Sequence, residues 1–179
     1  MAKAVGPGTL CGLVRLSGGA NMESWAFDWA GSGYVLRRAP SADYMAGRPY
    51  GHDEAALVIA AHGAGVRAPE VVGVLADGDG MGTGYVMRRI MAEVNPAKIV
   101  ADPPPSLLAD LGRELARIHA IPVSAIPAAI PLMDSAAALA ELKARFLTYG
   151  GDRPVIALAI KWCEEHLPPP AEPVLVHGD

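Results

Sequence analysis

The stretch that decides the fold is residues 10–38, LCGLVRLSGGANMESWAFDWAGSGYVLRR. It opens with the apolar run 10–16 and passes through the glycine-containing turn 17–21. Aromatic residues then alternate with small or polar residues over 24–29, a period of two that indicates a strand with one aromatic face. Two more glycines precede an apolar run that begins at Tyr34. The stretch therefore predicts three strands joined by glycine-rich turns.

One helix and one hairpin are predicted next. Residues 52–62 carry apolar side chains at helical spacing and are followed by a glycine, a typical helix end. Residues 71–75 and 85–90 are apolar runs separated by the turn sequence Asp-Gly-Asp-Gly. That turn does not open an EF-hand loop, because Met81 and Arg88 stand where the loop needs oxygen ligands.

Beyond residue 92 the pattern changes from strands to helices. Prolines at 96 and 103–105 mark a connector. Five apolar residues then fall on one stripe of a helix: Leu107, Leu108, Leu111, Leu115 and Ile118. Two more helices are predicted over 136–147 and 155–166, and a short strand over 174–176.

This order predicts an α+β fold of two lobes, with an antiparallel sheet and one helix in the first and helices in the second. We expect the sheet lobe over 1–92 and a hinge and linker over 93–105. A partial, incomplete helical lobe is expected over 106–179.

Composition and charge exclude several classes of protein. The 179 residues are 51% hydrophobic and 19% charged, which excludes a disordered chain. The net charge of −4 argues against nucleic acid as the main partner. No apolar stretch is long enough to cross a membrane, and no signal peptide is recognised. Cys11 and Cys163 form no disulfide framework, which favours a reducing, cytoplasmic setting.

The glycine turn is the first candidate for chemistry. A dinucleotide fingerprint or a Walker loop leads into a helix whose N-terminus holds the phosphate. This turn, with Gly18, Gly19 and Asn21, leads into a strand instead. A glycine hairpin that covers nucleotide phosphates is the arrangement of kinases. A plain hairpin is the alternative.

A charged pair is the second candidate. Val35 and Arg37 share one face of the predicted third strand. A cation there can reach phosphates beneath the glycine turn, and Glu54 in the first turn of the next helix can orient it. The alternative is a solvated arginine and a glutamate that favours the helix N-terminus.

The hinge and the end of the chain supply two more candidates. Met87, Arg88 and Arg89 lead into the linker, where backbone groups can hold a nucleotide base. An edge strand with a charged end is the alternative. The run 174–176 delivers His-Gly-Asp, in which Asp179 can accept a proton from a substrate hydroxyl. Here the alternative is a surface turn.

In this order the segments resemble the aminoglycoside phosphotransferase-like family, which includes choline kinases. The branch that looks most similar is related to the kinase domains fused to acyl-CoA dehydrogenases. The segments that carry the resemblance are 16–21, 34–40, 84–87, 115–119 and 174–179. The resemblance implies a protein-kinase-like fold, with ATP and Mg²⁺ as cofactors and a small-molecule hydroxyl as acceptor.

The resemblance also implies roles for single residues. Gly18 and Gly19 would lie over the ATP phosphates, with Asn21 in the same turn. Arg37 would take the place of the usual lysine and pair with Glu54. Backbone groups from Met87 through Arg88 to Arg89 would hold adenine. Asp179 matches the catalytic base, and His177 would support its loop.

The sequence departs from the family at its end. The family continues past Asp179 with an Asn and an Asp that bind Mg²⁺, so we expect the metal ligands beyond the end of this chain. We therefore expect the chain as written to be inactive. We also expect uncovered apolar faces, around 155–160 and 174–176, to favour self-association.

Other functions remain open at this point. A non-catalytic nucleotide-binding or interaction module is the alternative to an enzyme, and the residues beyond Asp179 would separate the two. A relative of the protein kinases is disfavoured by Gly178, where protein kinases carry an arginine. The acceptor is not readable from the sequence; hydroxyacyl-CoA or aminoglycoside-like compounds are the classes that the resemblance suggests.

Overall fold

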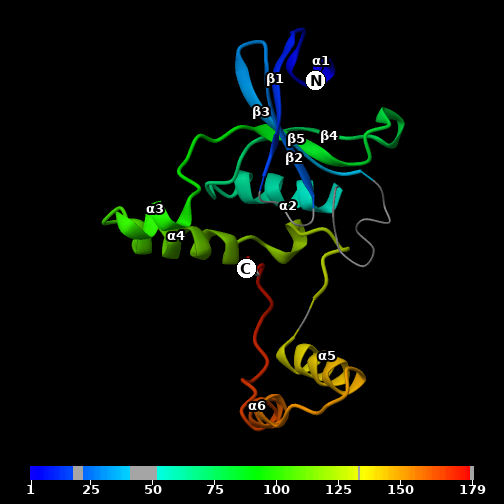
Figure 1. Cartoon of the computed structure of the whole chain (residues 1–179), viewed down its shortest axis with the longest axis vertical. Coiled ribbons are helices and arrows are strands. Elements are labelled where there is room, and N and C mark those ends of the chain that lie inside the picture. Colours follow the sequence, from blue (N-terminus) through cyan, green and yellow to red (C-terminus); the bar gives the residue numbers. More distant parts are fainter. Residues whose placement is uncertain (18–21, 41–51, 133, 178–179) are drawn as a thin grey trace. The chain divides into compact units, whose positions relative to one another are not determined.

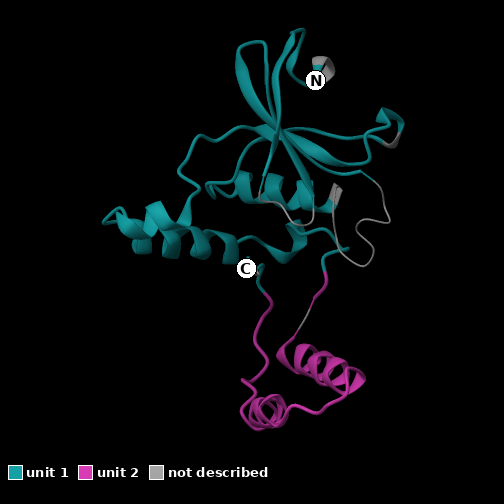
Figure 2. Cartoon of the chain, in the orientation of Figure 1, with its two compact units in different colours: residues 1–130, 174–179 teal, residues 131–173 magenta. Residues whose placement is uncertain are grey.

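The computed structural model describes residues 1–17, 22–40, 52–132 and 134–177 (Figure 1). The chain divides into two compact units (Figure 2). Unit 1 comprises residues 1–130 and 174–179, and unit 2 comprises residues 131–173. Unit 1 contains the sheet and every described residue of the candidate site.

Five antiparallel strands form one sheet in the order β1-β2-β3-β5-β4. The strands are β1 (Leu10–Leu16), β2 (Glu23–Trp29), β3 (Ser32–Ala39), β4 (Val71–Val74) and β5 (Thr83–Arg88). The meander predicted from residues 10–38 is therefore confirmed as β1, β2 and β3. The predicted second hairpin is confirmed as β4 and β5.

The turn between β2 and β3 shows why the meander forms. Trp29 pairs with Ser32, so only two residues connect the strands. Both have positive φ angles, 49° at Ala30 and 78° at Gly31. This is the pattern of a type I′ turn, whose twist matches that of the strands it joins. Gly31 meets the requirement without strain, whereas Ala30 adopts a backbone conformation that is uncommon for a residue with a side chain.

The sheet buries side chains on both of its faces. On one face, Phe27, Tyr34 and Val86 form a buried cluster, against which Trp29 and Leu36 pack. The aromatic face predicted for the second strand therefore contributes to a core. The other face meets α2 (His52–Gly63), whose Ala55 is fully buried (Figure 1). This second face carries the candidate site.

The remaining helices are α1 (Ala2–Val5), α3 (Pro96–Ala101), α4 (Leu107–His119), α5 (Ser135–Thr148) and α6 (Pro154–Glu165). Helices α2, α4, α5 and α6 confirm the four predicted helices. Helix α3 lies inside the predicted connector, where Pro96 starts a helix whose cap is Asn95; the Asn95 side chain accepts from the Ala97 N–H at 3.0 Å. None of the described helices is long and apolar enough to span a membrane.

Unit 2 is a pair of helices. Leu139 of α5 and Ile160 of α6 are buried, and Lys143 donates to Glu164 at 2.5 Å. Much of the apolar surface of α6 is uncovered, with Val155 80% exposed. This agrees with the expected uncovered face around 155–160, and self-association through it stays a prediction.

The short strand expected over 174–176 is wrong. These residues have no regular structure, and Val174 and Val176 are exposed. A strand is stable only where a neighbouring strand accepts its hydrogen bonds, and the described part of the chain provides none here.

Candidate functional site

The ion pair expected between Arg37 and Glu54 is present. Arg37 lies near the end of β3, and Glu54 lies in the first turn of α2. Arg37 Nε donates to Glu54 Oε1 at 2.8 Å, and the two side chains are 29% and 23% exposed. A pair this deeply placed is less screened by solvent than a surface pair. The sheet and α2 thus hold one cation beside one carboxylate.

A third residue of this cluster, Tyr85, is not foreseen from the sequence. Tyr85 of β5 pairs directly with Arg37 of β3 and is only 2% exposed. Its hydroxyl donates to the same Glu54 Oε1 at 3.1 Å. Alternation along β5 places Tyr85 on the face toward α2, but only the register between β3 and β5 reveals its partner.

The protonation state of Tyr85 is set by its surroundings. Burial raises the pKa of Tyr85, and the Glu54 carboxylate raises that pKa further. Arg37 acts in the opposite direction and does not reverse the shift. Tyr85 therefore keeps its proton at neutral pH and acts as a donor to Glu54.

Some polar groups of this cluster lack hydrogen-bond or ion-pair partners among the described residues. Glu54 Oε2 is buried and has no hydrogen-bond partner among the described residues. Arg37 meets Glu54 through Nε, and its terminal nitrogens form no ion pair with a second carboxylate of the described ranges. A guanidinium with N–H groups that lack an anionic partner can bind a phosphate.

Gly84 permits the close approach of β3 and β5. It pairs with Arg38, and a Cβ atom at this position would lie 2.1 Å from the backbone oxygen of Arg37. Any residue larger than glycine would therefore push the two strands apart. The glycine brings Tyr85 into register with Arg37.

The hinge residues lie where β5 ends. Met87 pairs with Val35, which is buried, across β3 and β5. The N–H of Arg88 donates to the Glu70 oxygen at 2.8 Å, and that of Arg89 to the Gly33 oxygen at 3.0 Å. These two N–H groups are thus already engaged in the fold. A base at this position would need the carbonyl groups or the N–H groups beyond Arg89.

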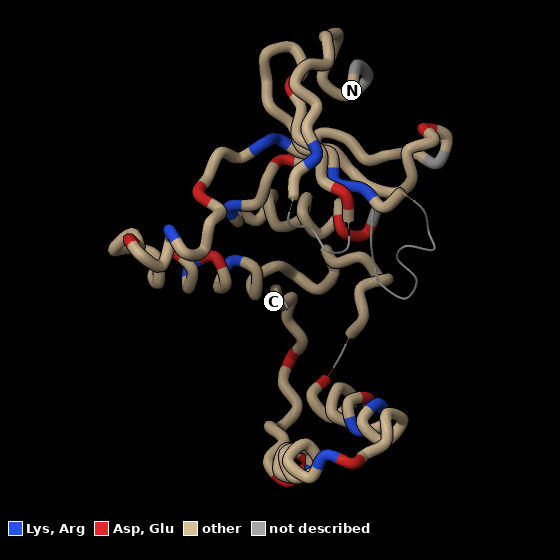
Figure 3. Tube along the Cα trace, in the orientation of Figure 1, with Lys and Arg blue, Asp and Glu red and all other residues tan. Residues whose placement is uncertain are grey.

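The side chains of the two hinge arginines are also engaged. Arg88 donates to the Tyr34 hydroxyl at 2.9 Å, and Arg89 to Asp28 at 2.6 Å. Basic and acidic residues lie close together along much of the sheet (Figure 3). Arg38 forms a further pair with Glu23 at 3.0 Å. Arg37 differs from these arginines because its carboxylate is shared with a buried tyrosine.

Four of the expected site residues lie outside the described residues: Gly18, Gly19, Asn21 and Asp179. The strands on either side of the glycine turn are described, and Leu16 of β1 pairs with Ser24 of β2. Strands β1 and β2 are therefore antiparallel neighbours, and the role expected of the glycine turn stays a prediction. His177 is described and exposed.

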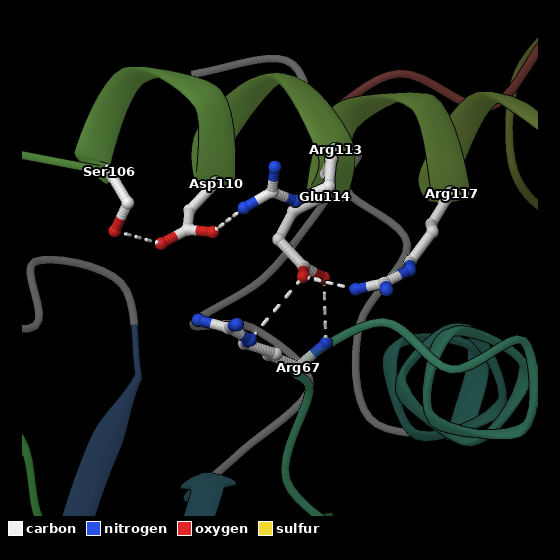
Figure 4. Close-up of polar contacts among 6 residues, drawn as sticks. All are labelled: Arg67, Ser106, Asp110, Arg113, Glu114 and Arg117. Atoms are coloured by element: carbon white, nitrogen blue, oxygen red, sulfur yellow. Dashed lines mark hydrogen bonds and ion pairs between the residues drawn. The ribbon is translucent and has the colours of Figure 1, made fainter.

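A second polar cluster joins α4 to the segment after α2 (Figure 4). Glu114 accepts from the Arg67 backbone N–H at 2.9 Å and from Arg117, and it forms an ion pair with Arg67 Nε at 3.5 Å. One turn earlier, Asp110 accepts from the Ser106 hydroxyl and from Arg113. These contacts lower the pKa of Asp110, with the Ser106 hydrogen bond as the largest cause.

Metal binding finds no support in the described ranges. They contain no group of three or more His, Cys, Asp or Glu side chains that could hold a metal ion.

One solved structure shows the same fold at low sequence identity. A candidate aminoglycoside phosphotransferase from Ralstonia eutropha has a TM-score of 0.64 and 17% identity, covering 91% of this chain and 49% of that chain. The chain thus spans about half the length of that structure. The predicted α+β, kinase-like fold, with an antiparallel sheet and helices, is confirmed by this likeness.

Two further structures are of a thermostable mutant of aminoglycoside phosphotransferase APH(4)-Ia. One is a ternary complex with AMP-PNP and hygromycin B (TM-score 0.44), the other with ADP and hygromycin B (TM-score 0.40). Each is 22% identical and covers 69% of this chain and 38% of its own.

A search of the curated proteins finds no match. The model of the phosphotransferase enzyme family, by contrast, matches residues 12–179, which is nearly the whole sequence. This match includes the sheet, α2 and the Arg37–Glu54 pair. The chain therefore belongs to the phosphotransferase enzyme family.

Proposed function

We propose that this chain supplies the nucleotide-binding part of an ATP-dependent phosphotransferase that acts on a small-molecule hydroxyl. Family membership supports the class of reaction. The single structural observation that carries the proposal is Arg37, held by Glu54 through Nε and without a second carboxylate partner among the described residues. When bound, ATP supplies the phosphoryl group that is transferred.

Phosphate binding falls to Arg37 in this proposal. Its terminal nitrogens would donate to phosphate oxygens, while Glu54 keeps the guanidinium in place. Because both side chains are largely removed from water, the charge acts more strongly than it would at the surface. Gly18, Gly19 and Asn21 would close the glycine turn over the same phosphates.

Base binding falls to the hinge. Val35 and Met87 would form part of the apolar surface for adenine, since they pair with each other across β3 and β5. The N–H groups of Arg88 and Arg89 are engaged in the sheet. The base would therefore use carbonyl groups of this segment, or the N–H of Ile90, which makes no hydrogen bond to another described residue.

The reaction itself needs a base for the acceptor hydroxyl, and Asp179 is the proposed residue. It would accept the hydroxyl proton as the hydroxyl oxygen bonds to the γ-phosphorus of ATP and the bond from that phosphorus to ADP, the leaving group, breaks. In this proposal, the lobe over 1–92 would bind the nucleotide, residues 93–105 would form the hinge, and residues 106–179 would belong to the catalytic lobe. Hydroxyacyl-CoA and aminoglycoside-like compounds are the proposed acceptor classes.

We expect the 179-residue chain to bind ATP without turnover. Phosphoryl transfer of this kind depends on Mg²⁺, and loss of one preorganised electrostatic group costs about 10²–10³ in rate. ATP hydrolysis or phosphoryl transfer above a protein-free control would contradict this.

Nucleotide binding is tested by titrating ATP into the chain and two variants. Arg37→Ala removes the proposed phosphate ligand and is expected to weaken ATP binding by about tenfold to a hundredfold. Arg38→Ala is the matched control, because Arg38 is the next residue on β3 and pairs with Glu23 instead. Equal ATP affinity in the two variants would contradict the proposal.

A further inference from the structure

One oxygen of Glu54 receives hydrogen bonds from two neighbouring strands. Arg37 Nε on β3 donates to Oε1 at 2.8 Å, and the Tyr85 hydroxyl on β5 donates to it at 3.1 Å. Arg37 and Tyr85 are paired across the two strands, so their side chains leave the sheet side by side and on the same face. Helix α2 brings Glu54 to both.

The arrangement differs from the usual contact between an arginine and a carboxylate. Such pairs often form two parallel N–H···O bonds, which would engage a terminal nitrogen of Arg37 together with Nε. Here Arg37 meets Glu54 through Nε, and the second oxygen, Oε2, has no partner among the described residues. The Tyr85 hydroxyl shares the oxygen that Nε uses and so fixes the direction of the carboxylate.

We propose that Tyr85 is a positioning residue for phosphate binding: its hydroxyl anchors Glu54 so that Arg37 is held through Nε and presents its terminal nitrogens to the nucleotide. This inference rests on the proposed function. It assigns a positioning role to Tyr85, a buried residue that would contact neither the nucleotide nor the acceptor.

The direction of the hydrogen bond between Tyr85 and Glu54 supports this role. The charged groups that face the hydroxyl are Glu54 from α2 and Arg37 from β3. The Tyr85 hydroxyl is the donor in this hydrogen bond, and a carboxylate oxygen of Glu54 accepts. Because Tyr85 is buried, this bond cannot be replaced by bulk water when the hydroxyl is removed.

The first test compares two buried tyrosines. Tyr85→Phe removes the hydroxyl and keeps the ring, and we expect ATP affinity to fall about threefold to tenfold. Affinity for adenosine, which has no phosphate, is expected to stay unchanged. Tyr34→Phe is the matched control: Tyr34 is 3% exposed, and its hydroxyl accepts from Arg88 instead. It is expected to leave both affinities unchanged.

The second test needs no nucleotide. The NMR signal of the Arg37 Nε–H, identified by its loss in Arg37→Lys, reports how firmly the guanidinium is held. We expect its hydrogen exchange to be about tenfold faster in Tyr85→Phe than in the unmodified chain, and unchanged in Tyr34→Phe. If the unmodified chain binds no ATP, the proposed function fails, and this signal still decides whether Tyr85 positions Arg37.

A double variant separates a positioning role from ordinary packing. If Tyr85 acts through Glu54, then adding Tyr85→Phe to Glu54→Gln weakens ATP binding no further than Glu54→Gln alone. Additive losses, equal losses for ATP and adenosine, or unchanged exchange of the Arg37 Nε–H would each overturn the inference. Glu54→Gln by itself also keeps the inference testable should Tyr85→Phe fail to fold, since it must accelerate the same exchange.

Discussion

Two glutamates in unit 1 are each held by an arginine, and they differ in how completely their oxygens are used. Glu114 has three polar contacts, and both of its oxygens have partners (Figure 4). Glu54 accepts two hydrogen bonds on one oxygen, and the other is buried without a described partner. A carboxylate whose two oxygens both have partners can only join parts of the structure. A carboxylate with one oxygen that lacks a partner keeps that group available for a ligand.

The comparison also separates the two arginines. Arg67 is 71% exposed and gives both its backbone N–H and its side chain to Glu114. Arg37 is 29% exposed and meets Glu54 through Nε. The first can be replaced at a modest cost in stability, and the second should be needed for phosphate binding. Three predictions sharpen this difference, in order of decreasing effect.

Removing the close approach of β3 and β5 should disturb the Glu54 cluster most. In Gly84→Ala, the new Cβ would lie 2.1 Å from the Arg37 oxygen, so the strands must separate. We expect the free energy of unfolding to fall by about 3 kcal/mol and ATP binding to be lost. Gly78→Ala is the control, because a Cβ there meets open space. Urea unfolding measures both variants, and equal stabilities would contradict the account.

Breaking the contacts of Glu114 should lower the free energy of unfolding but leave nucleotide binding unchanged. Glu114→Gln removes the charge that Arg67 and Arg117 share, and we expect it to cost about 1 kcal/mol. The Arg67 amide proton should exchange faster, while ATP affinity stays the same. Glu141→Gln is the control, because Glu141 is 59% exposed and lies 4.0 Å from its arginine. A loss of ATP affinity in Glu114→Gln would erase the distinction between the two clusters.

The smallest of the three effects should be the pH dependence that Asp110 of α4 gives to the free energy of unfolding. The pKa of Asp110 is lowered from 3.8, chiefly by the Ser106 hydrogen bond and then by Arg113. A lowered pKa means that the stabilisation is present above the unfolded value and is lost as the pH falls through the folded value. Asp110→Asn should therefore be slightly less stable than the unmodified chain at pH 7, and urea unfolding should show this difference shrinking as the pH falls below 3.8. A difference that stays constant with pH would contradict this.

The sequence predicted most of the fold because its signals are local. Alternation over 24–29 and the glycines around residue 31 define β2, β3 and the turn between them. The helical stripe that starts at residue 107 likewise defines α4. The strand expected over 174–176 failed because three apolar residues carry no information about whether a neighbouring strand exists.

The candidate site could be predicted only in part, and for a related reason. Arg37 and Glu54 could be predicted because Arg37 lies near the end of a strand and Glu54 lies in the first turn of a helix. In both elements the spacing of apolar residues shows on which face the side chain lies. Tyr85 was missed because its partner depends on the register of two strands that lie far apart in the sequence. The Glu114–Arg67 contact, across 47 residues, was missed for the same reason. Long-range pairing is a property of tertiary structure that local periodicity does not encode.

The most direct test of the account is an NMR titration of the chain with ATP that monitors the arginine Nε–H signals. Assignment rests on the loss of single signals in Arg37→Lys and Arg67→Lys. We predict that the Arg37 signal shifts as ATP is added and that the Arg67 signal stays in place. A shift at Arg67 without one at Arg37, or no shift at either, would contradict the claim that the Arg37–Glu54 pair binds the nucleotide phosphates.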